Sequence, residues 1–189
     1  FRRMLGFYRI RHAVTGAAPI SPNLIHWFNA IGVPLYEGFG MSETTATATV
    51  NYPGHIRLGT VGKVLEGSEV KIADDGEILM KSAGVFSGYW NNPQATQEAF
   101  TADGWFRTGD SGSIEDDFLT ITGRIKDIII TAGGKNIAPA EIENQLKFSP
   151  YISDAVVIGD QRKYLSCLIM IDQENVEKYA QDNRIPFSD

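Results

Sequence analysis

Apolar and polar residues alternate along several short segments in the middle of the chain, as they do in β-strands that have one buried face. An Asp-Asp-Gly sequence at residues 74–76 is typical of a tight hairpin turn between two of these strands. A helix is expected over residues 93–100. We therefore expect a small, distorted β-barrel or sandwich over residues 58–123. The predicted strands are 60–64, 69–72, 77–81 and 118–122.

The N-terminal segment has a different pattern. Short apolar strands are predicted at residues 11–16 and 33–38, on either side of a helix over residues 23–31. Ser21 suits the N-cap of this helix, because its hydroxyl can accept hydrogen bonds from the first free backbone N–H groups, and a proline follows at the first helical position. This order predicts a partial parallel β-α-β unit within residues 1–57, in which ligands bind beyond the carboxyl ends of the strands.

The C-terminal third has the element order of a small α+β domain. The composition changes near residues 123–126, so we expect this truncated domain to occupy residues 124–189. The fold class expected for the whole chain is α/β plus α+β. The predicted elements are a strand at 125–131, a loop at 132–136, a helix at 139–146, strands at 155–159 and 165–171, and a helix at 173–182.

Composition narrows the possible functions. The chain has 189 residues and a net charge of −6 without a long basic block, which argues against nucleic acid as the main partner. No apolar run approaches the roughly 18 residues that cross a bilayer. Cys167 is the one cysteine, lies in an apolar run, and is expected to be a buried strand residue in a reducing compartment. The expected location is the cytoplasm, with peripheral contact to the cytoplasmic face of a membrane left open.

The loop after residue 38 carries candidate chemistry. Phe39 offers an aromatic face, Gly40 exposes backbone, Ser42 has a hydroxyl and Glu43 a carboxylate. These groups are the ones needed to stack a base, contact a phosphate and bind Mg²⁺ through oxygen. The alternative is structural: Ser42 caps a helix and Glu43 occupies its first turn.

A second candidate site lies between residues 104 and 127. Asp110 follows a Thr-Gly pair, and Arg124 comes about a dozen residues later, after a hairpin with an acidic tip at residues 115–117. The carboxylate can accept from ligand hydroxyls and the guanidinium can donate in a planar fork. Taken alone, either sequence is more typical of a surface hairpin with a turn aspartate and an arginine at the strand end.

Four motifs in order resemble the adenylate-forming superfamily of acyl-CoA synthetases, luciferases and peptide-synthetase adenylation domains. Residues 105–110 (WFRTGD) are similar to its aromatic-Arg/Lys-Thr-Gly-Asp motif, and residues 123–127 (GRIKD) to its Gly-Arg motif. Glycines at 133–134 and Glu-Ile-Glu at 141–143 follow as in the family. The run at 159–165 (GDQRKYL) resembles long-chain fatty acyl-CoA synthetases of the bubblegum and bacterial types, although a hairpin turn explains it equally well.

The resemblance implies a two-step reaction, in which ATP and an acid give an acyl-adenylate and CoA then displaces AMP. Residues 39–43 are similar to the family's Tyr-Gly-x-Thr-Glu motif, with Phe and Ser in place of Tyr and Thr. The resemblance to the family also implies ATP, Mg²⁺, CoA and a fatty acid as partners. The implied roles are adenine contact for Gly16, Ala17, Ala18, Pro19 and Phe39; cofactor binding for Gly40; phosphate contact for Ser42; Mg²⁺ binding for Glu43; ribose contact for Asp110 and Arg124; a hinge at Lys126; and the pantetheine path for Gly133 and Gly134.

Two parts of the family pattern are absent from the sequence, namely the phosphate loop and the C-terminal adenylation lysine. We therefore expect a fragment of a longer long-chain fatty acid–CoA ligase that does not complete catalysis alone. A non-catalytic nucleotide-binding fragment and a ligase for an aryl, medium-chain or amino acid remain alternatives. The motif Gly-x-Gly-x-x-Gly after a strand, typical of dehydrogenases, does not occur, and the three histidines share no metal-ligand spacing.

Overall fold

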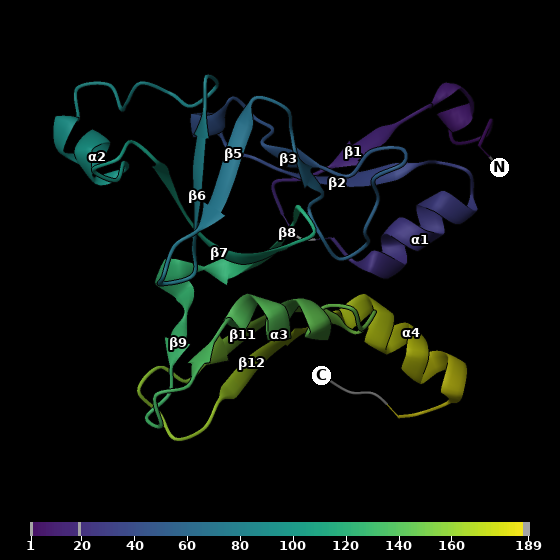
Figure 1. Ribbon diagram of the computed structural model, residues 1–189. Helices are drawn as coiled ribbons and strands as arrows, with labels where there is room; N and C mark the ends of the chain where they lie inside the picture. The colour runs from purple at the N-terminus through teal and green to yellow at the C-terminus, as the bar shows by residue number, and fades with distance from the viewer. Residues whose placement is uncertain (1, 19, 187–189) are drawn as a thin grey trace. The chain divides into compact units, whose positions relative to one another are not determined.

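The computed structural model describes residues 2–18 and 20–186. The chain divides into two compact units, Phe1–Ile125 and Lys126–Asp189 (Figure 1). The first unit contains one eight-stranded sheet, and the second contains two separate two-stranded sheets. Mixed α/β structure, as expected from the sequence, is therefore confirmed. Within the described ranges, no helix combines the length and the apolar character needed to cross a membrane.

The N-terminal β-α-β unit is present as predicted. Strand β1 (Ala13–Thr15) and strand β2 (Leu35–Phe39) pair in parallel, and helix α1 (Pro22–Ala30) connects them. Ser21 is the N-cap of α1, because its hydroxyl oxygen accepts from the backbone N–H groups of Asn23 at 3.1 Å and Leu24 at 3.3 Å. A short 3₁₀ helix, Phe7–Arg9, precedes the unit.

The large sheet continues from β2 through antiparallel strands only, in the order β1-β2-β3-β4-β8-β7-β6-β5. Its two outermost strands, β1 and β5, are not paired with each other, so the described residues form an open sheet and no closed barrel. The barrel expected over 58–123 is corrected accordingly: its strands extend the sheet of the β-α-β unit. The strands are β3 (Thr49–Val50), β4 (Lys63–Val64), β5 (Ser68–Ile72), β6 (Glu77–Ser82), β7 (Phe106–Glu115) and β8 (Phe118–Arg124).

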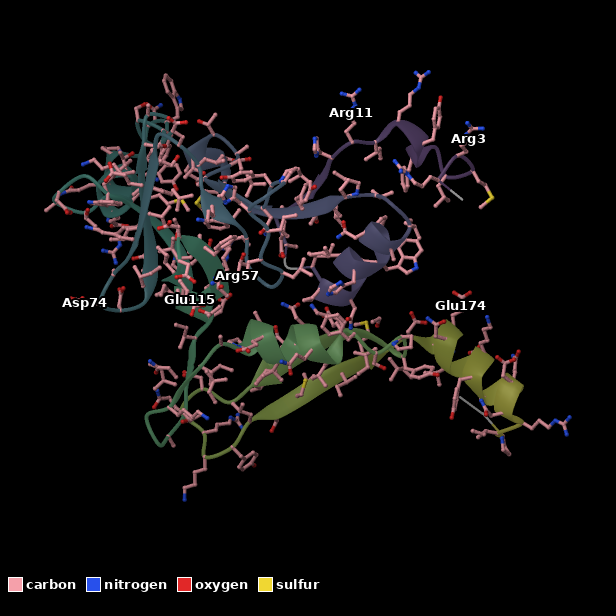
Figure 2. All side chains as sticks on the ribbon, turned by 45° about the vertical axis from the view of Figure 1, so that its right-hand side comes forward. Arg3, Arg11, Arg57, Asp74, Glu115 and Glu174 are labelled. Carbon is pink, nitrogen blue, oxygen red and sulfur yellow. The ribbon has the colours of Figure 1, made fainter. Side chains whose placement is uncertain are left out.

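The hairpin of β7 and β8 has the acidic tip that the sequence predicts. Asp116 and Asp117 both have positive φ angles, 50° and 68°, as tight turns between two antiparallel strands require. Arg57 lies against this tip, with Nη1 3.0 Å from Glu115 Oε2 and Nη2 2.7 Å from Asp116 Oδ2 (Figure 2). Both carboxylates are largely exposed, so these ion pairs contribute little to stability.

The core of the first unit lies on the central strands. Ile78 on β6 and Leu119 on β8 have no exposed surface, and Phe106 on β7 is 2% exposed. Partly buried aromatic rings, including Phe86 and Phe100, pack against this cluster from the segment around helix α2 (Pro93–Glu98). The core therefore fixes β6, β7 and β8 with respect to one another.

Truncation of Ile78 to alanine is expected to destabilise this unit by about 2–5 kcal/mol, because a fully buried side chain leaves a cavity that the central strands cannot close. The measurement is urea unfolding followed by tryptophan fluorescence. Ile56→Ala is the control, since Ile56 is 50% exposed and its loss should change the free energy of unfolding by no more than about 0.5 kcal/mol. Equal effects of the two substitutions would contradict the assignment of the core.

A 3₁₀ turn, Ile125–Asp127, covers the last residue of the first unit and the first two residues of the second, where a continuous strand over 125–131 was expected. Helix α3 packs against strand β11, and the Glu143 carboxylate of α3 accepts from the Val157 N–H of β11 at 2.8 Å. Cys167 was expected to be buried and is exposed, because every residue of its strand β12 is exposed. The other elements are β9 (Ile129–Ile130), β10 (Asn136–Ile137), α3 (Pro139–Leu146), β11 (Ile152–Ile158), β12 (Ser166–Ile171) and α4 (Gln173–Asn183).

Candidate functional site

A pocket of about 350 Å³ lies at the carboxyl ends of β1 and β2. The two strands are parallel, so the loops that follow them leave the same edge of the sheet. The pocket is lined by residues 14–17, 38–42 and 46–47. Both loops were predicted from the sequence to lie at such an edge, and the structure brings them together around one cavity.

Most of the residues proposed for this region line the pocket. The ones that do are Gly16, Ala17, Phe39, Gly40 and Ser42. Ala18 and Glu43 do not belong to the lining, and Pro19 lies outside the described residues. Val14, Thr15, Met41, Ala46 and Thr47 also line the pocket and were not singled out from the sequence.

Two glycines allow the two loops to approach closely. A Cβ atom on Gly16 would lie 2.9 Å from the Gly38 carbonyl oxygen, on the neighbouring strand. A Cβ on Gly40 would lie 1.6 Å from the carbonyl oxygen of Ala46, which is shorter than any non-bonded contact. Glycine is therefore a steric requirement at residue 40, where the loop folds back on itself beside the pocket.

The loop after Gly40 forms a 3₁₀ turn, η2 (Ser42–Thr44). Met41, and not Ser42, is its N-cap residue, and the hydroxyl of Thr44 accepts from the Met41 N–H at 3.0 Å. Ser42 therefore does not cap the turn, whereas Glu43 does lie in its first turn, as the structural alternative also expected. Ser42 is an exposed residue of the pocket lining.

Glu43 follows Ser42 in this turn and has one polar side-chain contact. Its Oε1 accepts a hydrogen bond from the Tyr89 hydroxyl at 3.0 Å, and Oε2 has no hydrogen-bond partner within the part of the chain that the structure describes. Burial, together with the hydrogen bond to Glu43 and the charge of that carboxylate, raises the pKa of Tyr89. The tyrosine hydroxyl is therefore protonated and donates at neutral pH.

The chemistry of this donor set fits Mg²⁺. Mg²⁺ is commonly held by one or two carboxylates and completes its octahedral shell with substrate phosphates and water. Across residues 2–18 and 20–186, no three or more His, Cys, Asp or Glu side chains gather into an all-protein metal cage. Glu43, with one carboxylate oxygen uncommitted, can supply one such ligand beside the pocket.

Asp110 and Arg124 are brought together as their order in the sequence predicts. They are directly opposed in the β7–β8 pair, and Arg124 Nε lies 3.4 Å from Asp110 Oδ1. The Asp110 side chain is only 10% exposed, whereas that of Arg124 is 70% exposed. Neither residue belongs to the lining of the pocket described above. Asp110 therefore contributes a largely buried carboxylate, and the exposed guanidinium of Arg124 lies beside it.

The buried side chain of Glu77 holds the backbone next to Asp110 in place. Glu77 Oε1 accepts from the Gly109 N–H at 2.9 Å, and Glu77 Oε2 lies 2.7 Å from Arg107 Nη2. The Glu77 side chain is 5% exposed. Sequence reasoning missed this role, because the polar/apolar alternation of the strand predicted at residues 77–81 gives no sign that its first residue is buried.

Glu37 lies on β2 opposite Thr15, one residue before the pocket lining begins. Burial raises its pKa, and the backbone N–H of Ile20 partly offsets the effect by donating to the carboxylate. A raised pKa in the folded state means that Glu37 contributes stability below its unfolded-state pKa, and that this contribution is lost as the pH rises through the folded-state value.

We therefore expect Glu37→Gln to gain stability relative to the unsubstituted chain as the pH rises from about 4 to 7, because glutamine carries no charge to desolvate. The measurement is the free energy of unfolding in urea for both proteins across this range. The difference isolates residue 37, since all other titrating groups are shared. A difference in the free energy of unfolding that does not change with pH would contradict the raised pKa of Glu37.

The remaining predicted site residues belong to the second unit. Lys126 is its first residue and lies exposed in the 3₁₀ turn. Gly133 and Gly134 are exposed in the turn between β9 and β10, where Gly134 has a φ of +78° and its N–H donates to the Thr131 carbonyl at 2.8 Å. Residues 159–165 connect the antiparallel strands β11 and β12, so the hairpin interpretation of that run is correct.

Comparison with known proteins identifies both units. Residues 3–90 match the model of the AMP-binding enzyme family, and residues 126–186 match the model of the AMP-binding enzyme C-terminal domain. The long-chain-fatty-acid–CoA ligase FadD15 of Mycobacterium bovis is 52% identical over 174 residues, which are 92% of this chain and 29% of that protein. The bovine long-chain-fatty-acid–CoA ligase ACSBG1 (Bos taurus) is 42% identical over 177 residues, 90% of this chain and 24% of that protein.

Solved structures agree with this family. The o-succinylbenzoate-CoA synthetase MenE of Bacillus subtilis, solved with the acyl-adenylate intermediate OSB-AMP, superposes with a TM-score of 0.80 at 28% identity, covering 95% of this chain and 42% of that one. The anthranilate-CoA ligase AuaEII, solved with anthranoyl-AMP, gives a TM-score of 0.78 at 27% identity, covering 95% and 37%. The chain spans less than a third of the length of the curated relatives described above. It belongs to the adenylate-forming, or AMP-binding, enzyme superfamily, and it resembles the long-chain fatty acyl-CoA synthetases of that superfamily.

Proposed function

We propose that the chain is part of an ATP-dependent long-chain fatty acid–CoA ligase. The observation that carries the proposal is the 52% identity to a long-chain-fatty-acid–CoA ligase over 92% of the chain. In the reaction, the fatty acid carboxylate attacks the α-phosphate of ATP to give acyl-adenylate and pyrophosphate. The CoA thiolate then displaces AMP to give acyl-CoA. Catalysis of this kind depends on positioning and on charge stabilisation, and needs no covalent enzyme intermediate.

The pocket at the ends of β1 and β2 is proposed to hold the adenine and the α-phosphate. Phe39 provides an aromatic face for the base, and Gly16 and Ala17 supply backbone and small side chains for close contact. Ala18 and Pro19 belong to the same proposed loop. Gly40 and Ser42 line the same pocket, and the hydroxyl of the exposed Ser42 is proposed to donate to a phosphate oxygen.

Glu43 is proposed as the protein ligand of Mg²⁺. When bound, the cation would offset the negative charge of the ATP phosphates during attack by the carboxylate. The support is the carboxylate itself, which directly follows a pocket-lining residue and has one oxygen without a hydrogen-bond partner in the described ranges.

Asp110 and Arg124 are proposed to hold the ribose. The carboxylate of Asp110 can accept from both ribose hydroxyls, and its low exposure keeps it in one conformation. The exposed Arg124 can donate to the ribose or to the phosphate while it remains next to Asp110. The two residues lie directly opposite each other on the paired strands β7 and β8, which supports a shared role in binding the ribose.

The second unit is proposed to act in the CoA step. Lys126 would be the hinge about which this unit turns between the two half-reactions, since element-terminal residues commonly absorb such rotation. The exposed Gly133–Gly134 turn would line the path of the pantetheine arm, where the absence of side chains leaves room for it. We also propose that the ligase is cytoplasmic and that it contacts the cytoplasmic face of a membrane peripherally.

A ligase for an aromatic acid is the second candidate. It is favoured by the structural similarity to synthetases of o-succinylbenzoate and anthranilate, at 28% and 27% identity. The higher identity to long-chain ligases makes the fatty acid the preferred substrate class.

The test is ATP–pyrophosphate exchange by the full-length protein that contains this chain, with a panel of acids from acetate to palmitate and with benzoate and anthranilate beside them. We expect exchange to be highest with the long-chain acids. Highest exchange with an aromatic acid would select the second candidate. A folded protein that shows no exchange with any acid would overturn the ligase assignment.

A further inference from the structure

The segment that follows β6 is joined by hydrogen bonds to the turn that contains Glu43 and to the residue after it. The Phe86 N–H donates to the Glu43 carbonyl at 2.8 Å, and the Thr45 hydroxyl donates to the Gly84 carbonyl at 2.6 Å. A third contact reaches the carboxylate itself, where the Tyr89 hydroxyl donates to Oε1 at 3.0 Å. The first contact holds the backbone of the turn, the second holds the Thr45 side chain at its end, and the third orients the Glu43 side chain.

Tyr89 is itself held in place. Its ring meets the Phe86 ring edge-on, with centroids 4.8 Å apart, and Phe86 packs in turn on the buried Phe106. Its backbone N–H donates to the Thr96 hydroxyl at 2.9 Å. The tyrosine hydroxyl is therefore held in a defined position by contacts that lead back to the hydrophobic core, even though Tyr89 is 41% exposed.

We propose that Tyr89 is a positioning residue for Glu43 that holds one carboxylate oxygen, so that the other oxygen faces the Mg²⁺ of the bound nucleotide. The inference rests on the proposed function, because it assigns Glu43 to the cation. A free glutamate side chain samples several rotamers, and the hydrogen bond selects one of them before ligand binding. Partners that orient a metal ligand commonly change metal affinity by about 10–100-fold.

The aromatic ring of Tyr89 packs against Phe86 and therefore has a structural role. The hydroxyl is different, because its hydrogen-bond acceptor is the carboxylate of a proposed ligand. A purely structural hydroxyl would tie two loops together and would affect stability or every mode of nucleotide binding alike. A positioning hydroxyl would affect only the part of nucleotide binding that depends on the cation.

The test is calorimetric titration of ATP into the full-length protein, with and without Mg²⁺. The measured quantity is the gain in ATP affinity that Mg²⁺ provides, which is a ratio and is therefore insensitive to the fraction of folded protein. Tyr89→Phe removes the hydroxyl and keeps the ring on Phe86. Tyr52→Phe is the matched control, since it is also a partly exposed tyrosine of the first unit and does not line the pocket.

We expect Tyr89→Phe to reduce the Mg²⁺-dependent gain by about 10-fold, to leave ATP affinity without Mg²⁺ unchanged, and to have no further effect in a Glu43→Gln background. Tyr52→Phe should retain the full gain. An unchanged gain in Tyr89→Phe, or an equal loss with and without Mg²⁺, would overturn the positioning role and leave the proposed function intact. A wild-type protein that does not bind ATP would overturn both.

Discussion

Substitution of Gly40 by alanine is expected to lower ATP–pyrophosphate exchange by about 100-fold or more, because misplacement of a site loop by about 1 Å has effects of this size. The added Cβ would lie 1.6 Å from the Ala46 carbonyl oxygen and 2.4 Å from its carbonyl carbon, and both are backbone atoms that cannot rotate away. The loop must therefore open, which moves Phe39 and Ser42 with it. The same change should cost about 1–3 kcal/mol of stability.

The matched control for Gly40→Ala is Gly67→Ala. Gly67 has a φ of +84°, and a Cβ added there would have no other atom within 4 Å, so its substitution introduces backbone strain of about 1–2 kcal/mol without a steric clash. The two variants are compared for free energy of unfolding in urea and for exchange rate. We expect similar losses of stability and a loss of exchange in Gly40→Ala alone. Full exchange in a folded Gly40→Ala protein would show that the loop does not shape the nucleotide site.

Loss of the Asp110 carboxylate is expected to lower kcat/KM for ATP by about 100-fold or more. Hydrogen bonds to a charged group contribute about 1.5–3 kcal/mol each, and two ribose hydroxyls lose their acceptor in Asp110→Ala. Since each 1.36 kcal/mol is a factor of ten, two such bonds reach this magnitude. Arg124 is 70% exposed and is hydrated when its partner is removed, so no buried charge is left unpaired.

Two further variants separate the role of the Asp110 charge from an effect on folding. Asp110→Asn retains the shape and one acceptor oxygen, and it should lose less activity than Asp110→Ala. Glu115→Ala removes an exposed carboxylate near the tip of the same hairpin, whose ion pair with Arg57 contributes at most about 1 kcal/mol. It should retain full activity. Equal kcat/KM for ATP in Asp110→Ala and Glu115→Ala, both folded, would exclude a ribose role for Asp110.

Local signals in the sequence were sufficient for the N-terminal unit and for the pairing of Asp110 with Arg124. The N-cap Ser21, the proline after it and Gly32 define α1 to within a residue, because each acts through backbone geometry close by in the chain. The two site residues meet because a tight turn at residues 116–117 sets the register of β7 against β8. These are effects of short-range chemistry, which a sequence displays directly.

Features that depend on distant partners could not be predicted in the same way. Alternation along residues 60–81 indicates strands but does not show that they extend the sheet of β1 and β2, so an open sheet was mistaken for a barrel. Cys167 lies in an apolar run, yet its strand is exposed because the two-stranded sheet of β11 and β12 gives it no cover. The contacts of Glu77 with Gly109 and of Tyr89 with Glu43 join residues 32 and 46 positions apart.

The measurement that tests the account most directly is a crystal structure of the full-length protein with a non-hydrolysable palmitoyl-adenylate analogue, in which a sulfamoyl group replaces the phosphate. We expect the adenine against Phe39 and the Gly16–Ala17 backbone, and the ribose hydroxyls hydrogen-bonded to the Asp110 carboxylate. An analogue bound with its adenine outside the pocket of residues 14–17, 38–42 and 46–47, or with its ribose away from Asp110, would contradict the account.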